Sequence, residues 1–210
     1  MKAAFALVSV LFVGNGIAFS RADEAPRPAK PNEEELRKSW DKFLQATDFQ
    51  RVAKDYPKAI QNLKSAEADQ QVAGLATLSA TGEPEVIPWI VPLLDAPDAR
   101  VRVHAGLALD KLVSGVALKR RGPPFDRVVL KPLGPKDPDL RPLAWVVLQM
   151  LKKPDDGNTH GYAATMIRYL ELKEFEPELR QLLQSRHPAV TNAARFALEG
   201  LGFPVGATDR

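Results

Sequence analysis

Two stretches of this chain repeat the same turn-then-helix pattern without a gap. They are LLDAPDARVRVHAGLALDKL at residues 93–112 and LLQSRHPAVTNAARFALEGL at residues 182–201. In the first stretch the apolar side chains recur at helical spacing and form one stripe: Val101, Ala105, Ala108, Leu109 and Leu112. A helix with a single apolar face needs a partner to cover it, and a stack of helix pairs supplies that cover repeatedly. The pattern therefore predicts an all-α fold built from stacked helix pairs.

Each repeated helix is preceded by a shorter apolar segment, which we expect to form the first helix of its pair. In the central unit this segment is EVIPWIVPLL, residues 85–94. Pro84 stands just before it, where a missing N–H costs nothing. Pro92 lies too far along the segment to be tolerated in a regular helix, so it predicts a kink or an early end. The second helix is expected at residues 99–113.

Small residues mark the register of successive units. We place Ala73, Ala105, Ala163 and Ala194 at the same packed position, with spacings of 32, 58 and 31 residues. The spacings of 32 and 31 residues equal one helix pair. The spacing of 58 exceeds one pair, which predicts an insertion at about residues 114–137. A different division makes FDRVVLKPL a first helix and DPDLRPLAWVVLQML its second, but it leaves the helix at 159–172 without a partner.

The N-terminal third has a different composition. Residues 1–22 have a basic start, an apolar run and then small residues, as in a cleaved signal peptide, and 23–32 read as a Pro- and Ala-rich linker. Residues 33–66 read as an N-terminal helical cap, and the repeats follow at 67–203. This organisation predicts a periplasmic or secreted protein with no integral membrane segment after signal removal. Without residues 1–22 the net charge becomes 27 − 26 = +1, which argues against nucleic acid as a partner.

The pattern Glu-Val-Ile-Pro-x-x-x-x-Leu-Leu, a short loop with Asp, then Val-Arg-x-x-Ala-x-x-Ala-Leu-x-x-Leu resembles a HEAT-like repeat. It is most similar to the short repeats of phycobilisome-lyase-type proteins and covers about residues 67–202. The resemblance implies a right-handed α-α superhelix, or solenoid, that binds proteins or peptides and whose second helices usually line the concave face. Some relatives are lyases or hydroxylases, so the resemblance does not exclude an enzyme.

Catalytic and metal-binding motifs are scarce in this sequence. The three histidines, His104, His160 and His187, are scattered, and there is no cysteine. The chain has no His-Glu-x-x-His, no Gly-x-Ser-x-Gly and no phosphate-binding loop. We therefore expect no catalytic residues, no metal and no cofactor.

Basic residues are the candidates for partner binding. Lys119, Arg120 and Arg121 form the densest basic cluster and lie in the insertion, where they suit an acidic partner. A second candidate is a polar strip across successive helices, formed by Arg100, Arg102, Arg168 and Arg195. The competing interpretations are a solvated loop for the cluster and solvated helix faces for the strip.

These observations predict an exported, monomeric, non-catalytic scaffold that binds a protein or peptide along the repeat face and the insertion loop. One alternative is a lyase-like enzyme or small-molecule binder, which needs a deep pocket with convergent acid and base groups. Another is a structural envelope component, which would self-associate.

Overall fold

The computed structural model describes residues 29–119, 138–154 and 157–206 of the 210-residue chain. Within these ranges every regular element is a helix and no strand forms. The α-helices are α1 (Glu33–Ala46), α2 (Phe49–Asp55), α3 (Pro57–Leu63), α4 (Ala68–Thr81), α5 (Ile87–Ile90), α6 (Ala99–Lys119), α7 (Ala144–Leu151), α8 (Thr159–Tyr169), α9 (Glu176–Leu182) and α10 (Pro188–Gly200). Four short 3₁₀ segments join them: η1 (Pro84–Val86), η2 (Val91–Asp95), η3 (Arg141–Leu143) and η4 (Lys173–Phe175). The predicted all-α class is confirmed.

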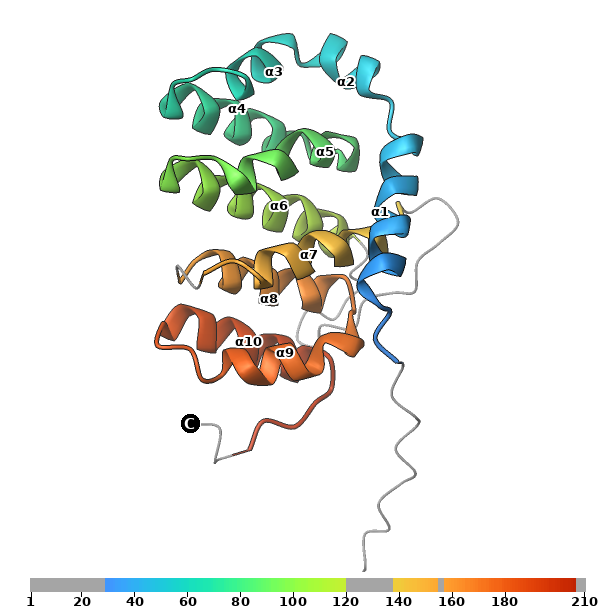
Figure 1. Ribbon diagram of the computed structural model, residues 1–210, viewed down its shortest axis with the longest axis vertical. Coiled ribbons are helices and arrows are strands. Elements are labelled where there is room, and N and C mark those ends of the chain that lie inside the picture. The colour runs from blue at the N-terminus through green and yellow to red at the C-terminus, as the bar shows by residue number, and fades with distance from the viewer. Residues whose placement is uncertain (1–28, 120–137, 155–156, 207–210) are drawn as a thin grey trace, which may run out of the picture.

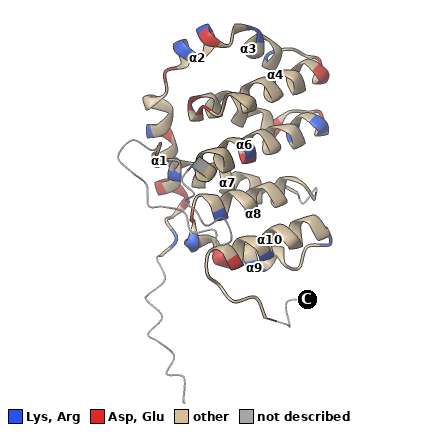
Figure 2. Cartoon of the chain, turned by 180° about the vertical axis from the view of Figure 1, so that it is seen from behind, with Lys and Arg blue, Asp and Glu red and all other residues tan. Residues whose placement is uncertain are grey.

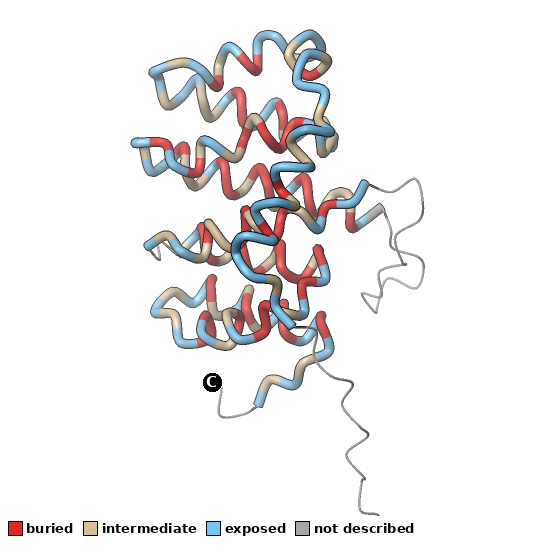
Figure 3. Tube along the Cα trace, turned by 45° about the vertical axis from the view of Figure 1, so that its right-hand side comes forward, coloured by how far each residue is buried: buried red, intermediate tan, exposed pale blue. Residues whose placement is uncertain are grey.

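The longer helices α4, α6, α8 and α10 lie side by side, each packed on the next (Figure 1). The shorter helices α3, α5, α7 and α9 precede them in turn, and each packs against the longer helix that follows it. The molecule is therefore a row of helix pairs, with the buried residues concentrated between the helices (Figure 3). We call α4, α6, α8 and α10 the second helices and their partners the first helices.

Helix α6 shows why the pattern produces this arrangement. Its predicted stripe is buried, with Val101, Ala105 and Leu109 all at 0% exposure. The helix is longer than predicted, however, because it continues beyond Val113 to Lys119 and buries Ala117 as well. The first part of the predicted insertion is thus helical, and residues 120–137 lie outside the described residues.

The first helix before α6 is interrupted as its prolines require. The backbone is 3₁₀ at η1, α-helical for one turn at α5, and 3₁₀ again at η2, which begins one residue before Pro92. A proline removes the N–H that an α-helical hydrogen bond needs, so the tighter 3₁₀ form replaces it. Val86, Ile90 and Leu94 still reach the core.

The register predicted for the first unit is wrong. Ala105, Ala163 and Ala194 are fully buried, but Ala73 is exposed, and the buried residues of α4 are Gly74, Leu75 and Leu78. Helix α4 packs against α3 through Gly74, where an added Cβ would lie 2.9 Å from the carbonyl oxygen of Ala59. This close approach to α3 fixes the rotation of α4, and a match of small residues in the sequence did not detect it.

The predicted cap region, 33–66, occupies two separate places. Helices α2 and α3 lie at the end of the row beside α4. Helix α1, which begins with a capping box between Asn32 and Glu35, instead packs against α7 and η3. It crosses the first helices rather than running parallel to them (Figures 1 and 3).

Candidate interaction surfaces

The second helices form a face with few charged side chains. Their exposed residues are small or uncharged in most places, and include Ala73, Ala76, Thr77 and Ala80 on α4 and Asn192 on α10. Two of the large apolar side chains that remain exposed, Leu118 at 45% and Phe196 at 42%, also belong to second helices. We call this side of the row the second-helix face.

Arg168 supports Phe196 on this face. The guanidinium carbon of Arg168, on α8, lies 3.4 Å from the ring centroid of Phe196, on α10, and Nη1 donates to the Phe196 carbonyl oxygen at 3.4 Å. Arg168 is only 6% exposed because it fills the space beside Gly200, where an added Cβ would lie 2.3 Å from its Nε. Arg168 therefore lies neither on an exposed polar strip nor on a solvated helix face, because its charge is stacked and buried between two helices.

Asp110 is a partly buried carboxylate on α6. It stands one helical turn after Gly106, whose position faces the ring of Tyr162 on α8, so Asp110 lies on the side of α6 that faces α8. Its Oδ1 is buried and accepts no hydrogen bond from the described residues. Burial raises the pKa of Asp110 to about 6, because the charged form loses hydration without gaining a partner.

The two predicted arginines at the start of α6 make contacts within the protein. Arg100 Nη1 pairs with Asp69 of α4 at 3.0 Å, and Nη2 pairs with Asp98 at 3.2 Å. Arg102 Nη1 donates to the carbonyl oxygens of Ala96 and Pro97 at 2.8 and 2.7 Å. Arg102 thus ties the turn after η2 to α6, while Arg100 links α4 and α6 at the surface.

The remaining predicted basic residues lie elsewhere. Lys119 ends α6, nineteen residues after Arg100, which places the two about 28 Å apart at the helical rise of 1.5 Å per residue. Arg120 and Arg121 lie outside the described residues, and Arg195 is half-buried on α10. The structure does not gather these candidates into one patch, and basic residues are spread over several helices (Figure 2). Their role in partner binding stays a prediction.

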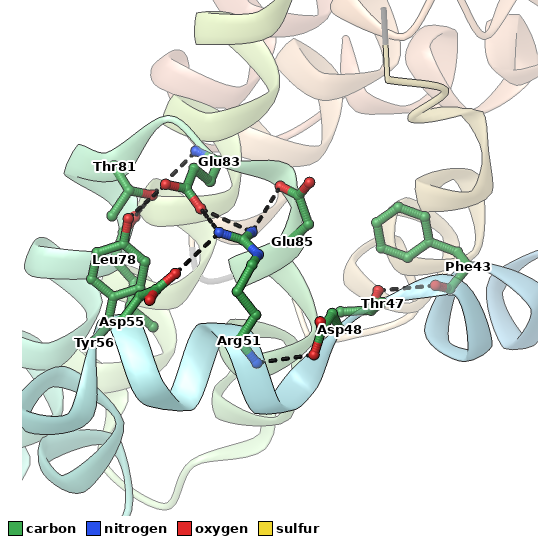
Figure 4. A network of polar contacts seen from close by, with 10 residues as sticks. All are labelled: Phe43, Thr47, Asp48, Arg51, Asp55, Tyr56, Leu78, Thr81, Glu83 and Glu85. Carbon is green, nitrogen blue, oxygen red and sulfur yellow. Dashed lines mark hydrogen bonds and ion pairs between the residues drawn. The ribbon is translucent and has the colours of Figure 1, made fainter.

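A polar network joins α2 and the start of α3 to the turn between α4 and η1 (Figure 4). Glu83, which follows α4, accepts a hydrogen bond from Tyr56 Oη at 2.6 Å and two from the Arg51 guanidinium at 3.1 Å. Arg51 also pairs with Asp55 and Glu85. The Tyr56 hydroxyl and then Arg51 hold the pKa of Glu83 below its usual value.

Charged and aromatic contacts hold the N-terminal segment against the first helices. Lys30 pairs with Glu178 of α9, and its Nζ lies 4.5 Å above the ring centroid of Phe175. Glu33 pairs with Lys152 at the end of α7, and this contact lowers the pKa of Glu33. We call residues 30–46 the strap.

Two clefts open between the first helices and their surroundings. One, of 340 Å³, is lined by residues from the end of α7 and from α8 and α9, including His160, Glu178 and Gln181. The His160 Nε2 lies 2.9 Å from the Lys153 carbonyl oxygen, so the backbone already engages this ring. The other, of 390 Å³, borders the strap.

The part of the chain that the structure describes contains no cluster of His, Cys, Asp and Glu suited to a metal ion.

Sequence reasoning missed the residues that join distant parts of the chain: Arg51 with Glu83, Arg168 with Phe196, and Lys30 with Glu178. Helical periodicity carries no information about these pairs because their members belong to different elements. The capping box between Asn32 and Glu35 fixes where α1 starts, but such a local contact does not determine where the helix packs.

Fold and surfaces together define an all-helical protein of stacked helix pairs. Comparison of the chain with known protein families, with curated proteins and with solved structures returns no match. Among the helices of the described residues, none combines the length and the apolar character needed to span a membrane.

Proposed function

We propose that this protein is a non-catalytic interaction scaffold, a HEAT-like solenoid that binds a protein or peptide partner along its second-helix face. The observation that carries the proposal is the exposure of Leu118 and Phe196 on that face. Contiguous exposed apolar patches mark interaction surfaces, whereas single exposed apolar side chains are ordinary, so the support here is that both residues belong to second helices. Aromatic and apolar anchors of this kind supply much of the affinity in protein interfaces.

The charge of the face differs from helix to helix. Helix α4 has no charged residue after Asp69, and Arg168 is the only one in α8. Arg100 and Lys111 on α6 and Glu199 on α10 are exposed charges of the same face. The Arg168 stack also holds the Phe196 ring in place. A partner that covers Phe196 therefore meets a preformed aromatic anchor, which lowers the entropy lost on binding.

The remaining elements of the proposal rest on the sequence. We propose a right-handed superhelix from the repeat resemblance, a periplasmic or secreted location from residues 1–22, and a monomeric scaffold. An acidic region of the partner would meet the Lys119–Arg120–Arg121 cluster.

The experiment compares chemical cross-linking and pull-down from envelope extract with three baits: the purified protein, a Leu118→Ser/Phe196→Ser variant, and a Lys58→Glu/Gln61→Glu variant. The first pair removes the anchors of the second-helix face, and the matched control changes exposed residues of α3. We expect a partner that the protein and the control capture and the first variant loses. Capture by all three folded baits alike would remove the second-helix face as the binding site, and capture by none would remove the scaffold function.

A further inference from the structure

Helix α1 occupies a site that its position in the sequence does not require. It packs against α7 and η3, about one hundred residues further along the chain. Only Thr47 and Asp48 join it to α2, and both have non-helical backbone angles, with ψ of 128° and 84°. The strap is therefore joined to α2 by a non-helical link of two residues and held to the row of helix pairs by side-chain contacts.

The apolar contacts of the strap lie on a single face of α1. Leu36 and Trp40 are each 6% exposed, and Phe43 and Leu44 are partly buried against the same core. Their spacing of four, seven and eight residues forms one stripe on an α-helix, and the rest of α1 is largely exposed (Figure 3). The surface of α7 and η3 beneath α1, which we call the groove, thus receives an amphipathic helix laid across it.

Charge complementarity fixes the direction of this helix. Its acidic first turn lies against Lys152 through Glu33, and the basic residue before it, Lys30, reaches Glu178 and Phe175. Opposite charges at the two positions favour this direction over a reversed helix, because reversal would remove both pairs. The groove therefore fits a helix that carries, in chain order, a basic residue before its start, an acidic first turn and the apolar stripe.

The strap fits this groove incompletely. A cleft of 390 Å³ remains open beside Leu36 and Ser39, bordered on the other side by residues of and near η3 and η4, including Arg141, Pro142 and Leu172. At the basic position, Glu178 Oε1 pairs with Lys30, but Oε2 is buried and accepts no hydrogen bond from the described residues. A guanidinium, with paired donors, matches both carboxylate oxygens where an ammonium engages one.

We propose that the groove beneath α1 is a docking site for an amphipathic helix of a partner protein, and that the strap occupies this site in cis until the partner helix displaces it. The partner helix carries an arginine before an acidic first turn and a Leu–Trp pair four residues apart. This site lies on the first helices and so goes beyond the scaffold function assigned to the second-helix face; it does not depend on that function.

The test measures binding of a fluorescent peptide with the sequence of residues 29–47 to the purified protein. In a Leu36→Ala/Trp40→Ala variant the strap loses its anchors and leaves the groove open. We expect this variant to bind the peptide at least tenfold more tightly than the unaltered protein. The matched control is Glu34→Ala/Lys38→Ala, which changes an exposed ion pair of α1 and leaves the groove closed. A peptide carrying the same two alanines as the opened variant should not bind.

Substitution at the basic position gives a second test. A peptide with Arg in place of Lys30 should bind the opened variant several-fold more tightly than the native peptide. If circular dichroism shows that Leu36→Ala/Trp40→Ala has lost helicity in the row, Lys30→Ala/Glu33→Ala weakens strap docking without altering the core, and a smaller gain in peptide binding is expected. Equal peptide binding by opened, control and unaltered proteins would overturn the proposal. So would dimerisation of an opened variant without peptide, because it would assign the groove to a second copy of the chain.

Discussion

Helices α8 and α1 are both amphipathic, but they are covered in different ways. Helix α8 packs against α6, α7 and α10, so that most of its circumference is enclosed by the helices that precede and follow it. Helix α1 is covered on one side only, by elements far along the chain. The comparison shows that α8 is covered by its neighbours in the row, whereas α1 is covered mainly by α7 and η3, although Leu36 and Trp40 belong to the same core cluster as the row.

The largest expected effect comes from truncating a buried side chain in the core of the row. Leu109 is fully buried on α6, and Leu109→Ala should lower the free energy of unfolding by about 3 kcal/mol, because it removes apolar contacts and leaves a cavity. Because α6 contacts both α4 and α8, the loss should appear in one cooperative transition. Urea unfolding followed by circular dichroism measures it. A loss below about 1 kcal/mol would show that truncating Leu109 costs no more than a surface substitution, which would contradict tight packing between the helix pairs.

Trp40→Ala should produce a more local effect. Its side chain is buried, and its loss should weaken strap docking by about 3 kcal/mol, at the low end for a buried tryptophan because α1 is covered on one side only. Native-state hydrogen exchange would then show α1 amides exchanging much faster while those of α6 and α8 stay protected. Loss of protection throughout the row would contradict the separation of strap and row.

This difference also explains what the sequence could predict. The stripe of α6, the interruption near Pro92 and the cap at Asn32 depend on neighbouring residues, and all three were predictable from local patterns. The position of α1 and the stacking of Arg168 on Phe196 depend on which distant surface comes closest, and no spacing encodes that.

The sequence indicates which residue types could bind a partner, but not which of those residues are exposed and free to do so. Basic residues were singled out by charge, but Arg100 and Arg102 are engaged by Asp69 and by backbone carbonyls. The exposed apolar residues Leu118 and Phe196 were not singled out, because an apolar residue on an amphipathic helix is expected to be buried. Exposure depends on where neighbouring helices end, which requires the three-dimensional arrangement.

Two helical glycines test how closely the second helices pack. An added Cβ at Gly200 would lie 2.3 Å from Arg168 Nε, so Gly200→Ala should displace the guanidinium and cost about 1 to 2 kcal/mol. At Gly161 an added Cβ meets nothing within 4 Å, so Gly161→Ala should stabilise the protein by about 0.5 to 1 kcal/mol through helix propensity. Thermal unfolding of both variants measures the contrast. Equal effects of the two substitutions would show that the Arg168 side chain moves aside without cost when a Cβ is added at Gly200.

The effects of pH should have opposite signs in the two regions. Burial raises the pKa of Asp110 to about 6, above its unfolded value of 3.8, so the folded row prefers the protonated carboxyl. The row should therefore lose stability as pH rises from about 4 to 6 and change little above that. Asp110→Asn should remove this dependence and stabilise the protein at pH 7 by about 1 to 2 kcal/mol, because no charge is then buried.

The strap should respond in the other direction. Lys152 lowers the pKa of Glu33 below its ordinary 4.5, so the ionised carboxylate favours docking, and that contribution is lost as pH falls through the lowered value. Acidification from pH 6 to pH 4 should first raise the stability of the row. Further acidification should weaken the docking of α1. Hydrogen exchange of α1 and α6 amides across this range measures both changes, with Glu33→Gln as the control that flattens only the response of α1. Parallel changes in the two helices would show that strap and row unfold as one unit, which would remove the independence on which displacement of α1 by a partner helix depends.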